Sequence, residues 1–441
     1  MRAKAISEDI KKAIIYQLFL PMFTAEGTLA AAAEMLPHIK ETGATHVYLC
    51  PVCEHDDDTD ESMWSDRQRA SGFGNPKNPY RIGDYFKIEP NYGTDEDLTA
   101  FVTKAHTLGL KVMLDLVYFH CGPCAAVLGL SPDYVIRNEH GEPEMGEWHF
   151  PKLNFASDGL RGYLYSNMEY FVRKFDIDGF RMDVGDRIPL DFWENAVKKL
   201  SHVKPDLFML NEGDDPAFLE TAFECNYNYE WQATVERIFR RNAPASALSV
   251  MHGRYAVTIE DWRGLRAIET HDMVNDAYDN RIEKSIGAQG MDAIFVINFL
   301  SDGIPFIYNG NEICDTVRHS IFSDREHGKL SINWRNALTE RGMRRMALIG
   351  KLSELRRSTS ALYDGTLTWL DTAARDSVIS FVRENGKKVF VFVNTRNEKQ
   401  VFDTDMAERV TPMLQYNAHF DKSGARNTIT LLSYGYLVLS E

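Results

Sequence analysis

The sequence predicts an α/β protein built mainly as a (β/α)8 barrel, followed by a small all-β domain. Apolar, β-rich runs alternate with amphipathic helices over most of the 441 residues, which is typical of parallel strand–helix units. Eight such units over about 340 residues fit a barrel with insertions, since an open doubly wound sheet more often has five or six strands. In the last part of the chain, β-rich runs follow one another without helices between them.

The eight expected strands are short apolar runs, several of which end in polar residues. They are Ile14–Leu20, Val47–Cys50, Leu110–Val117, Gly179–Asp183, Leu207–Glu212, Ala222–Asn226, Arg266–Glu269 and Pro305–Tyr308. The intervening helices carry apolar residues three and four positions apart, as at Leu98, Val102 and Ala105. Asp95 and Asp97 lie at the start of that helix, where carboxylates favour the positive end of the helix dipole.

The expected barrel comprises residues 1–120 and 158–360, with a short inserted loop at residues 121–157 after the third strand. Residues 361–441 are expected to form a C-terminal β-sandwich domain. Asn385-Gly386, between two β-rich runs, is the strongest short signal for a hairpin there.

Composition narrows the classes of partner. The net charge of −15 would repel a phosphate backbone and no basic patch offsets it, so we expect an uncharged substrate and no nucleic acid. No apolar run approaches the roughly twenty residues that span a membrane, and the N-terminal run is too short for a signal peptide. We therefore expect a cytoplasmic protein. Its six cysteines do not form a disulfide framework.

Polar residues gather at the ends of four expected strands, where the active site of a barrel lies. They are Asp115, His120, Arg181, Asp183, Glu212, His271 and Asp272. Arg181 and Asp183 are two positions apart on a strand, so we expect Arg181 to lower the pKa of Asp183. Glu212 would then keep its proton beside that anion. One carboxylate that attacks and one acid that protonates are the two groups of a retaining glycosidase.

Five further segments occur in the order in which one known family has them. They are Val47–Pro51, Asn78–Tyr80 with Asp84-Tyr85, Tyr92–Leu98, Phe150–Asn154 and Gly303–Glu312. With the strand-end residues, they show that the chain resembles the α-amylase family, glycoside hydrolase family 13, from Ile15 to the terminal β-domain. Asp186-Arg187 and the Pro-Lys-Leu-Asn segment are nearer the pattern of cyclomaltodextrinases and neopullulanases.

The resemblance implies a role for each matching residue. Asp183 would be the nucleophile, Glu212 the acid/base and Asp272 the third carboxylate. His120 and His271 would bind sugar hydroxyls, Arg181 would support Asp183, and Tyr80 would stack on the sugar ring. The implied function is hydrolysis of α-glucosidic bonds in maltodextrins or other α-1,4-glucans, with retention, through a covalent glycosyl–enzyme intermediate. An α-glucan transglycosylase or an isomerase with a trehalose- or sucrose-type donor remains an alternative on the same site.

No cofactor is expected. Phe119 stands where many α-amylases have an asparagine calcium ligand, and its ring offers no oxygen to a hard cation. Two Cys-x-x-Cys pairs, at Cys50 and Cys53 and at Cys121 and Cys124, leave a structural zinc site or a redox protein as a second hypothesis. A third is a binding protein without turnover, but none of the three acids is lost.

Overall fold

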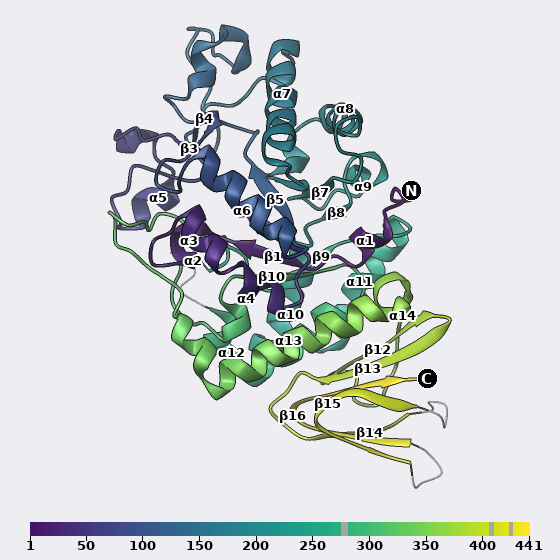
Figure 1. Ribbon diagram of the computed structural model, residues 1–441. Helices are drawn as coiled ribbons and strands as arrows, with labels where there is room; N and C mark the ends of the chain where they lie inside the picture. Colours follow the sequence, from purple (N-terminus) through teal and green to yellow (C-terminus); the bar gives the residue numbers. More distant parts are fainter. Residues whose placement is uncertain (275–280, 405–409, 423–426) are drawn as a thin grey trace.

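A computed structural model of the protein describes residues 1–274, 281–404, 410–422 and 427–441 (Figure 1). In these residues, eight parallel strands form the barrel in the order β8-β7-β6-β5-β2-β1-β10-β9. They are β1 (Ile15–Leu18), β2 (His46–Leu49), β5 (Lys111–Leu116), β6 (Gly179–Met182), β7 (Phe208–Asn211), β8 (Cys225–Asn226), β9 (Leu265–Arg266) and β10 (Ile304–Tyr308). A parallel bridge between Asn226 and Gly264 joins the two ends of this order. The predicted (β/α)8 barrel is thus confirmed.

Helices follow the barrel strands along the chain and cover the outside of the barrel (Figure 1). They are α1 (Glu8–Lys11), α2 (Leu20–Phe23), α3 (Leu29–Glu34), α4 (Leu36–Glu41), α5 (Asp66–Ala70), α6 (Asp95–Thr107), α7 (Asp158–Phe175), α8 (Leu190–Leu200), α9 (Ala217–Thr221), α10 (Tyr229–Arg241), α11 (Ser246–Thr258), α12 (Ile282–Leu300), α13 (Glu340–Ser358) and α14 (Ser360–Asp364). The start of α6 is fixed by a capping box between Thr94 and Asp97. None of the described helices is long and apolar enough to cross a bilayer.

The seventh strand is shorter than expected and begins one residue earlier. β9 pairs with β10 only at Leu265 and Arg266, although the apolar run suggested a strand to Glu269. The chain leaves the ladder after Arg266, and the carboxylate of Glu269 accepts a hydrogen bond from the buried guanidinium of Arg281 instead. Glu269 thus belongs to a side-chain network and not to the strand ladder.

Two segments follow the C-terminal ends of neighbouring strands and contact one another. After β2, the strands β3 (Cys53–His55) and β4 (Ile82–Ile88) form a small antiparallel sheet, with α5 between them. After β5 comes the expected insertion, held to the first segment by Gly122 N, which donates to Ile82 O over 2.8 Å. Cys124 N also donates to Asp56 Oδ2 over 2.7 Å. Together these segments form one wall beside the strand ends.

The C-terminal part is all-β, as predicted. Its strands are β11 (Thr366–Trp369), β12 (Val378–Asn385), β13 (Lys387–Asn394), β14 (Gln400–Thr404), β15 (Thr411–Asp421) and β16 (Asn427–Ser440). All pairings are antiparallel, and the long β16 pairs with β13, β14 and β15, so hydrogen bonding runs continuously through the domain. The expected hairpin turns at Gly386, whose φ of 70° is the left-handed conformation that glycine favours.

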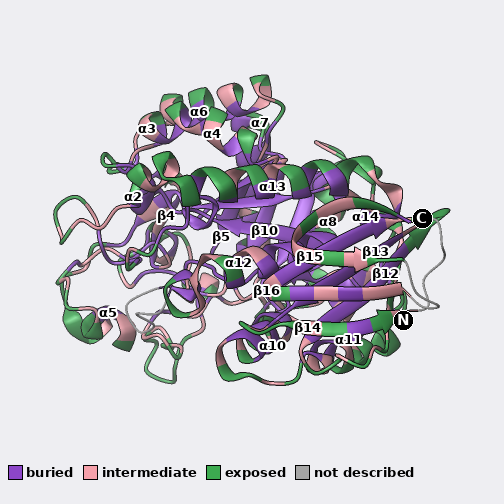
Figure 2. Cartoon of the chain, turned by 90° about the horizontal axis from the view of Figure 1, so that it is seen from below, coloured by how far each residue is buried: buried purple, intermediate pink, exposed green. Residues whose placement is uncertain are grey.

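Strands β12 and β13 are buried on both faces (Figure 2). Phe390 and Phe392 pack in the core of the C-terminal domain, whereas Val389 and Val391 join the large core shared with the barrel helices. This explains why the two runs are continuously apolar instead of alternating with polar residues.

Two arginines bind backbone carbonyls at the junction between the barrel and this domain. The C-terminal carbonyls of α12 have no partner within the helix. Arg356 Nη1 donates to Phe299 O and to Ser301 O, each over 3.0 Å. From β12, Arg383 donates to Leu300 O over 3.3 Å and to Gly365 O over 2.8 Å. Both guanidinium groups are buried, so the negative end of a barrel helix is capped partly by the C-terminal domain.

We expect Arg383→Met to lower the free energy of unfolding by about 1–3 kcal/mol, because the buried carbonyls of Leu300 and Gly365 lose their donor. Urea unfolding followed by circular dichroism measures the change. Arg375→Met, at an exposed position of the same domain, is the control and should shift the unfolding midpoint little. Equal effects of the two substitutions would contradict the capping role of Arg383.

Candidate active site

One buried guanidinium binds three carboxylates at the C-terminal ends of β5, β6 and β7. Arg181 Nη1 lies 2.7 Å from Asp115 Oδ1 and 3.0 Å from Asp183 Oδ1. Its Nη2 lies 2.7 Å from Glu212 Oε2. The parallel register places Asp115 beside Arg181, and Glu212 directly follows the neighbouring strand β7. The structure thus brings together Arg181, Asp183 and Glu212, as the strand-end pattern predicted.

The charge of Arg181 is divided among these carboxylates, and this changes the expected ionisation of Asp183. Burial and the nearby carboxylate of Glu212 raise the pKa of Asp183 well above its ordinary value, and the lowering by Arg181 does not compensate. The expectation that Arg181 keeps the pKa of Asp183 low is therefore wrong.

Two further groups fix the carboxylate of Glu212. Val184 N donates to Glu212 Oε2 over 2.7 Å, and Tyr229 Oη donates to Oε1 over 2.7 Å. Val184 has a φ of 40°, a conformation in which a β-branched residue is strained. This strained peptide unit directly follows Asp183. The same short backbone segment therefore carries the carboxyl group of Asp183 and orients that of Glu212.

The loop after Glu212 is tied to a carboxylate from the loop after β6. Asp186 accepts hydrogen bonds from Asp214 N over 2.8 Å and from Asp215 N over 2.9 Å. Gly213 lies so close that a Cβ atom there would come within 2.1 Å of Asp186 Oδ1. The path of the chain beyond Glu212 therefore requires glycine at this position.

The third acid has its own pair of partners. Asp272 Oδ2 lies 3.1 Å from His271 Nε2, and Asp272 Oδ1 accepts from Arg67 Nη1 over 2.9 Å. Burial opposes ionisation of Asp272, but His271 and Arg67 outweigh it and hold the pKa below its usual range. The pKa of Asp272 is thus shifted in the opposite direction from that of Asp183. His271 lies five residues beyond the end of β9, so an irregular segment and not the strand itself presents this acid.

The tautomer of His271 follows from its neighbours. Gln17 Oε1 accepts from the backbone N–H of His271, which turns the amide Nε2 of Gln17 toward His271 Nδ1 at 2.7 Å. Because that amide donates, Nδ1 accepts, and the ring proton is on Nε2. The single proton on His271 Nε2 can then be donated to Asp272 or to Tyr80 Oη, which lies 2.6 Å away.

Tyr80 joins these groups to the first cluster. Its ring stacks on His271 with centroids 5.1 Å apart, and its hydroxyl donates to Asp115 Oδ2 over 2.9 Å. Asp115 also accepts from Tyr48 and from Arg181. Asp115 is therefore saturated by protein donors, which indicates a structural role.

His120 begins the inserted loop and faces its aromatic residues. His120 Nε2 lies 2.8 Å from Tyr80 O, and its ring lies 5.2 Å from Trp148 and 5.0 Å from Phe150. Burial lowers the pKa of His120 to about 4, so the ring is neutral at physiological pH. The other nitrogen, Nδ1, is buried and has no partner among the described residues. It is available to a ligand hydroxyl.

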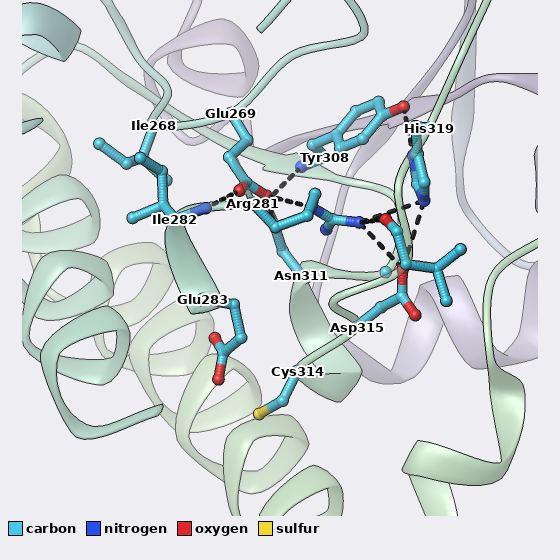
Figure 3. A network of polar contacts seen from close by, with 12 residues as sticks. Ile268, Glu269, Arg281, Ile282, Glu283, Tyr308, Asn311, Cys314, Asp315 and His319 are labelled. Carbon is cyan, nitrogen blue, oxygen red and sulfur yellow. Dashed lines mark hydrogen bonds and ion pairs between the residues drawn. The ribbon is translucent and has the colours of Figure 1, made fainter. Parts of the chain in front are cut away.

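The loop that carries Asp272 is anchored by a buried ionic network (Figure 3). Arg281 Nε donates to Glu269 Oε2 over 3.0 Å, and its Nη1 donates to Asp315 Oδ2 over 2.9 Å. Asn311 also donates to Glu269, over 2.6 Å. Glu269 lies two residues before His271, so this network fixes the start of the segment that bears His271 and Asp272.

The structure gives the calcium and zinc sites no support. The ring of Phe119 lies against the guanidinium of Arg187, 5.6 Å away, so a cation there would meet a positive charge and no oxygen. No three His, Cys, Asp or Glu side chains in the described ranges are grouped as metal ligands. All six cysteines are unpaired, and burial raises the pKa of Cys53 to about 12, which disfavours the reactive thiolate.

Two groups at the site were not predicted from the sequence. Arg67 lies on α5, in a segment without apolar periodicity, and nothing in its surroundings marked it. Tyr229 follows β8 by three residues. Tyr229 lies just beyond β8, the sixth barrel strand, and the rule that strand ends carry functional groups points to it as well.

A (β/α)8 barrel that gathers three carboxyl groups around arginines at the ends of its strands defines the class of this protein as a glycoside hydrolase. The sequence profile described as "Alpha amylase, catalytic domain" matches residues 8–129 and 144–358. The chain belongs to this family, whose members act on α-glucosidic bonds with retention of configuration. The gap in this match, residues 130–143, lies within the inserted loop.

Individual relatives are distant. The chain is 23% identical to alpha-amylase 2 of Dictyoglomus thermophilum over 433 residues, covering 89% of this chain and 71% of that protein. It is 26% identical to a cyclomaltodextrinase of Geobacillus thermopakistaniensis over 405 residues, covering 84% and 63%, so it spans less than two thirds of that relative. The crystal structure of a maltogenic alpha-amylase from Thermotoga neapolitana has a TM-score of 0.82, with 22% identity and coverage of 98% and 99%. At this identity, the likeness supports the fold.

We expect Gly213→Ala to reduce kcat at least about tenfold, because the added Cβ would displace Asp186 or the loop that follows Glu212. Gly162→Ala is the matched control, since a Cβ on that exposed helix position meets no atom within 4 Å. Steady-state kinetics on a maltodextrin, with circular dichroism to check folding, measure the effect. Equal kcat values for the two variants would show that Asp186 does not constrain the loop.

Proposed function

We propose that this enzyme hydrolyses α-1,4-glucosidic bonds of maltodextrins, with Asp183 as nucleophile and Glu212 as acid/base. The observation that carries the proposal is the single buried guanidinium of Arg181, which contacts both carboxyl groups. In the retaining mechanism, Asp183 attacks the anomeric carbon while Glu212 protonates the departing oxygen, and Glu212 then activates the water that cleaves the glycosyl–Asp183 ester.

The other groups bind and orient the sugar in this proposal. Asp272, held ionised by His271 and Arg67, accepts hydrogen bonds from sugar hydroxyls and stabilises positive charge on the ring at the transition state. His120 presents its free Nδ1 to a hydroxyl, and Tyr80 offers its ring beside His271. On binding, sugar hydroxyls displace Arg67 from part of Asp272.

Tyr229 extends the acid/base assignment. Its hydroxyl donates to Glu212 and would steady the carboxyl group as it loses and regains its proton.

The six unpaired cysteines agree with a reducing compartment, and we place the reaction in the cytoplasm.

We expect the first sugar released to have the α-configuration, because two inversions at one carbon restore it. Proton NMR of the anomeric signals during the first minutes of maltodextrin hydrolysis measures this. Release of the β-anomer first would contradict the roles of Asp183 and Glu212. Products longer than the donor would show that a sugar, instead of water, accepts the glycosyl group.

Glu212→Gln should reduce kcat on maltodextrins by about 100-fold or more, since general acid catalysis contributes about 10²–10⁴-fold. The same variant should retain far more activity on α-glucosyl fluoride, whose leaving group needs little protonation. Glu194→Gln, at an exposed position of α8, is the matched control and should act like the wild type. Parallel losses on both substrates would contradict the acid role of Glu212.

We expect the acid limb of the kcat/KM profile to lie well above pH 4, the ordinary range of an aspartic acid. Burial and Glu212 raise the pKa of Asp183, and the nucleophile must be ionised, so activity falls as the pH drops through that raised value. Measurement of kcat/KM from pH 3 to pH 9 on a maltodextrin tests this. An acid limb at or below pH 4 would contradict the raised pKa of Asp183 in the free enzyme.

A further inference from the structure

A second cavity lies away from the catalytic groups, where the barrel helices meet the C-terminal sheet. Its volume is about 680 Å³, within the range of small-molecule sites. It is enclosed by the beginning of α12, the beginning of α13 and the strands β15 and β16. Figure 2 shows α12 beside these strands, and α12 packs directly on β16. Residues that carry its chemistry are Gln289, Arg344, Asn397, Tyr416 and Tyr434.

The backbone around this cavity departs from regular structure on three of the elements that line it, α12, β15 and β16. Gly287 has a φ of 77° inside α12 and interrupts the helix. Tyr434 has a φ of 48°, although only glycine adopts that region without strain. The pairing of β15 with β16 shifts register between Tyr416 and Ala418, and such bulges change the direction in which a side chain points. Strained residues of this kind cluster at binding sites.

The two tyrosine rings at the cavity are supported from behind. The ring of Tyr434 stacks on buried Phe239, with centroids 6.3 Å apart and planes 16° apart. Tyr416 packs against Tyr436 at 5.5 Å, and its hydroxyl accepts from Gln289 Nε2 over 2.9 Å. Both rings are half-buried. Arg344 lies over the ring of Tyr416, 5.3 Å from its centroid, so it is the ring of Tyr434 that offers a flat apolar face with little loss of side-chain freedom on binding.

The polar groups of the cavity select an uncharged ligand. Arg341 and Arg344 are balanced by Glu340 and Asp292, so the lining has no net formal charge to attract an anion or a cation. The guanidinium of Arg344 and the amides of Gln289 and Asn397 are planar groups with several donors, suited to the adjacent hydroxyls of a sugar. Flat rings beside such groups suit a pyranose, which has apolar faces and polar edges.

We propose that this cavity is a second, noncatalytic binding site for an α-glucan chain. This proposal rests on the proposed function, because an enzyme that hydrolyses α-glucans encounters them as its substrate. A glucan held here is tethered to the enzyme while another part of the same or a nearby chain is cleaved, which raises the local substrate concentration. Long glucans would gain from this site and short ones would not.

The test uses the full chain carrying Glu212→Gln, so that glucans stay intact, and titrates it with maltoheptaose by isothermal titration calorimetry. We expect two bound molecules per chain. Adding Tyr434→Ala should leave one and should weaken binding to amylose about tenfold or more, as expected from loss of a stacked ring. Tyr434→Phe keeps the ring and is the matched control, with two bound molecules.

A double variant on the helices, Gln289→Ala with Arg344→Ala, probes the cavity without altering the strained strand. It should also leave one bound molecule. A stoichiometry of one before any cavity substitution, or two that neither cavity variant reduces, would overturn the second site.

Turnover by the chain with Glu212 intact separates the two proposals. Cleavage of maltotriose together with a single glucan site overturns only the cavity assignment, whereas absence of cleavage overturns the proposed function. In the chain with Glu212 intact, Tyr434→Ala should leave kcat/KM for maltotriose unchanged and lower kcat/KM for amylose about tenfold. Equal effects on the two substrates would mean that Tyr434 acts on the catalytic groups, which contradicts a separate site.

Discussion

The arrangement of the site depends on one buried charge, the guanidinium of Arg181. Without it, the carboxyl groups of Asp115, Asp183 and Glu212 would repel each other in a region with little solvent. With it, two positive donor nitrogens hold the three carboxyl groups in fixed places, and the aromatic rings of Tyr80 and Tyr227 enclose the guanidinium from the sides. Burial and the carboxylate of Glu212 raise the pKa of Asp183 despite this cation, so the charge of Asp183 depends on its neighbour.

A second ionic unit supports the opposite side of the site. Arg281 joins Glu269 to Asp315, and this buried link spans the ends of the segment that presents Asp272 (Figure 3). The two ionic units position different acids. Arg181 contacts Asp183 and Glu212 directly, whereas the network around Arg281 fixes the start of the segment that bears Asp272. Asp272 and the pair Asp183 and Glu212 are therefore positioned by different buried arginines, although all three acids lie at the same end of the barrel.

Sequence patterns predicted the parts that depend on local periodicity. The barrel strands and the hairpin at Asn385-Gly386 followed from apolar spacing and turn chemistry, and the acids at strand ends followed from the geometry of the barrel. Patterns could not predict contacts between distant segments. Arg67 reaches Asp272 from the short helix α5, and β9 ends at Arg266 although the apolar run continues. The pKa of Asp183 was misjudged for the same reason, since it depends on how many carboxylates share Arg181. The assigned roles of the acids and of His120, His271 and Tyr80 stay predictions.

The capping of α12 by Arg383 also bears on how the chain folds as it is synthesised. The carbonyl of Leu300, at the end of α12, receives its hydrogen bond from Arg383 on β12. Strand β12 pairs with β13, and the other neighbour of β13 is β16. A nascent chain that has just completed its eighth barrel strand therefore exposes unpaired carbonyls and the apolar faces meant for β12 and β13. Burial of these faces requires β12 and β13, so the C-terminal strands complete the core of the barrel and are not a module added to a finished enzyme.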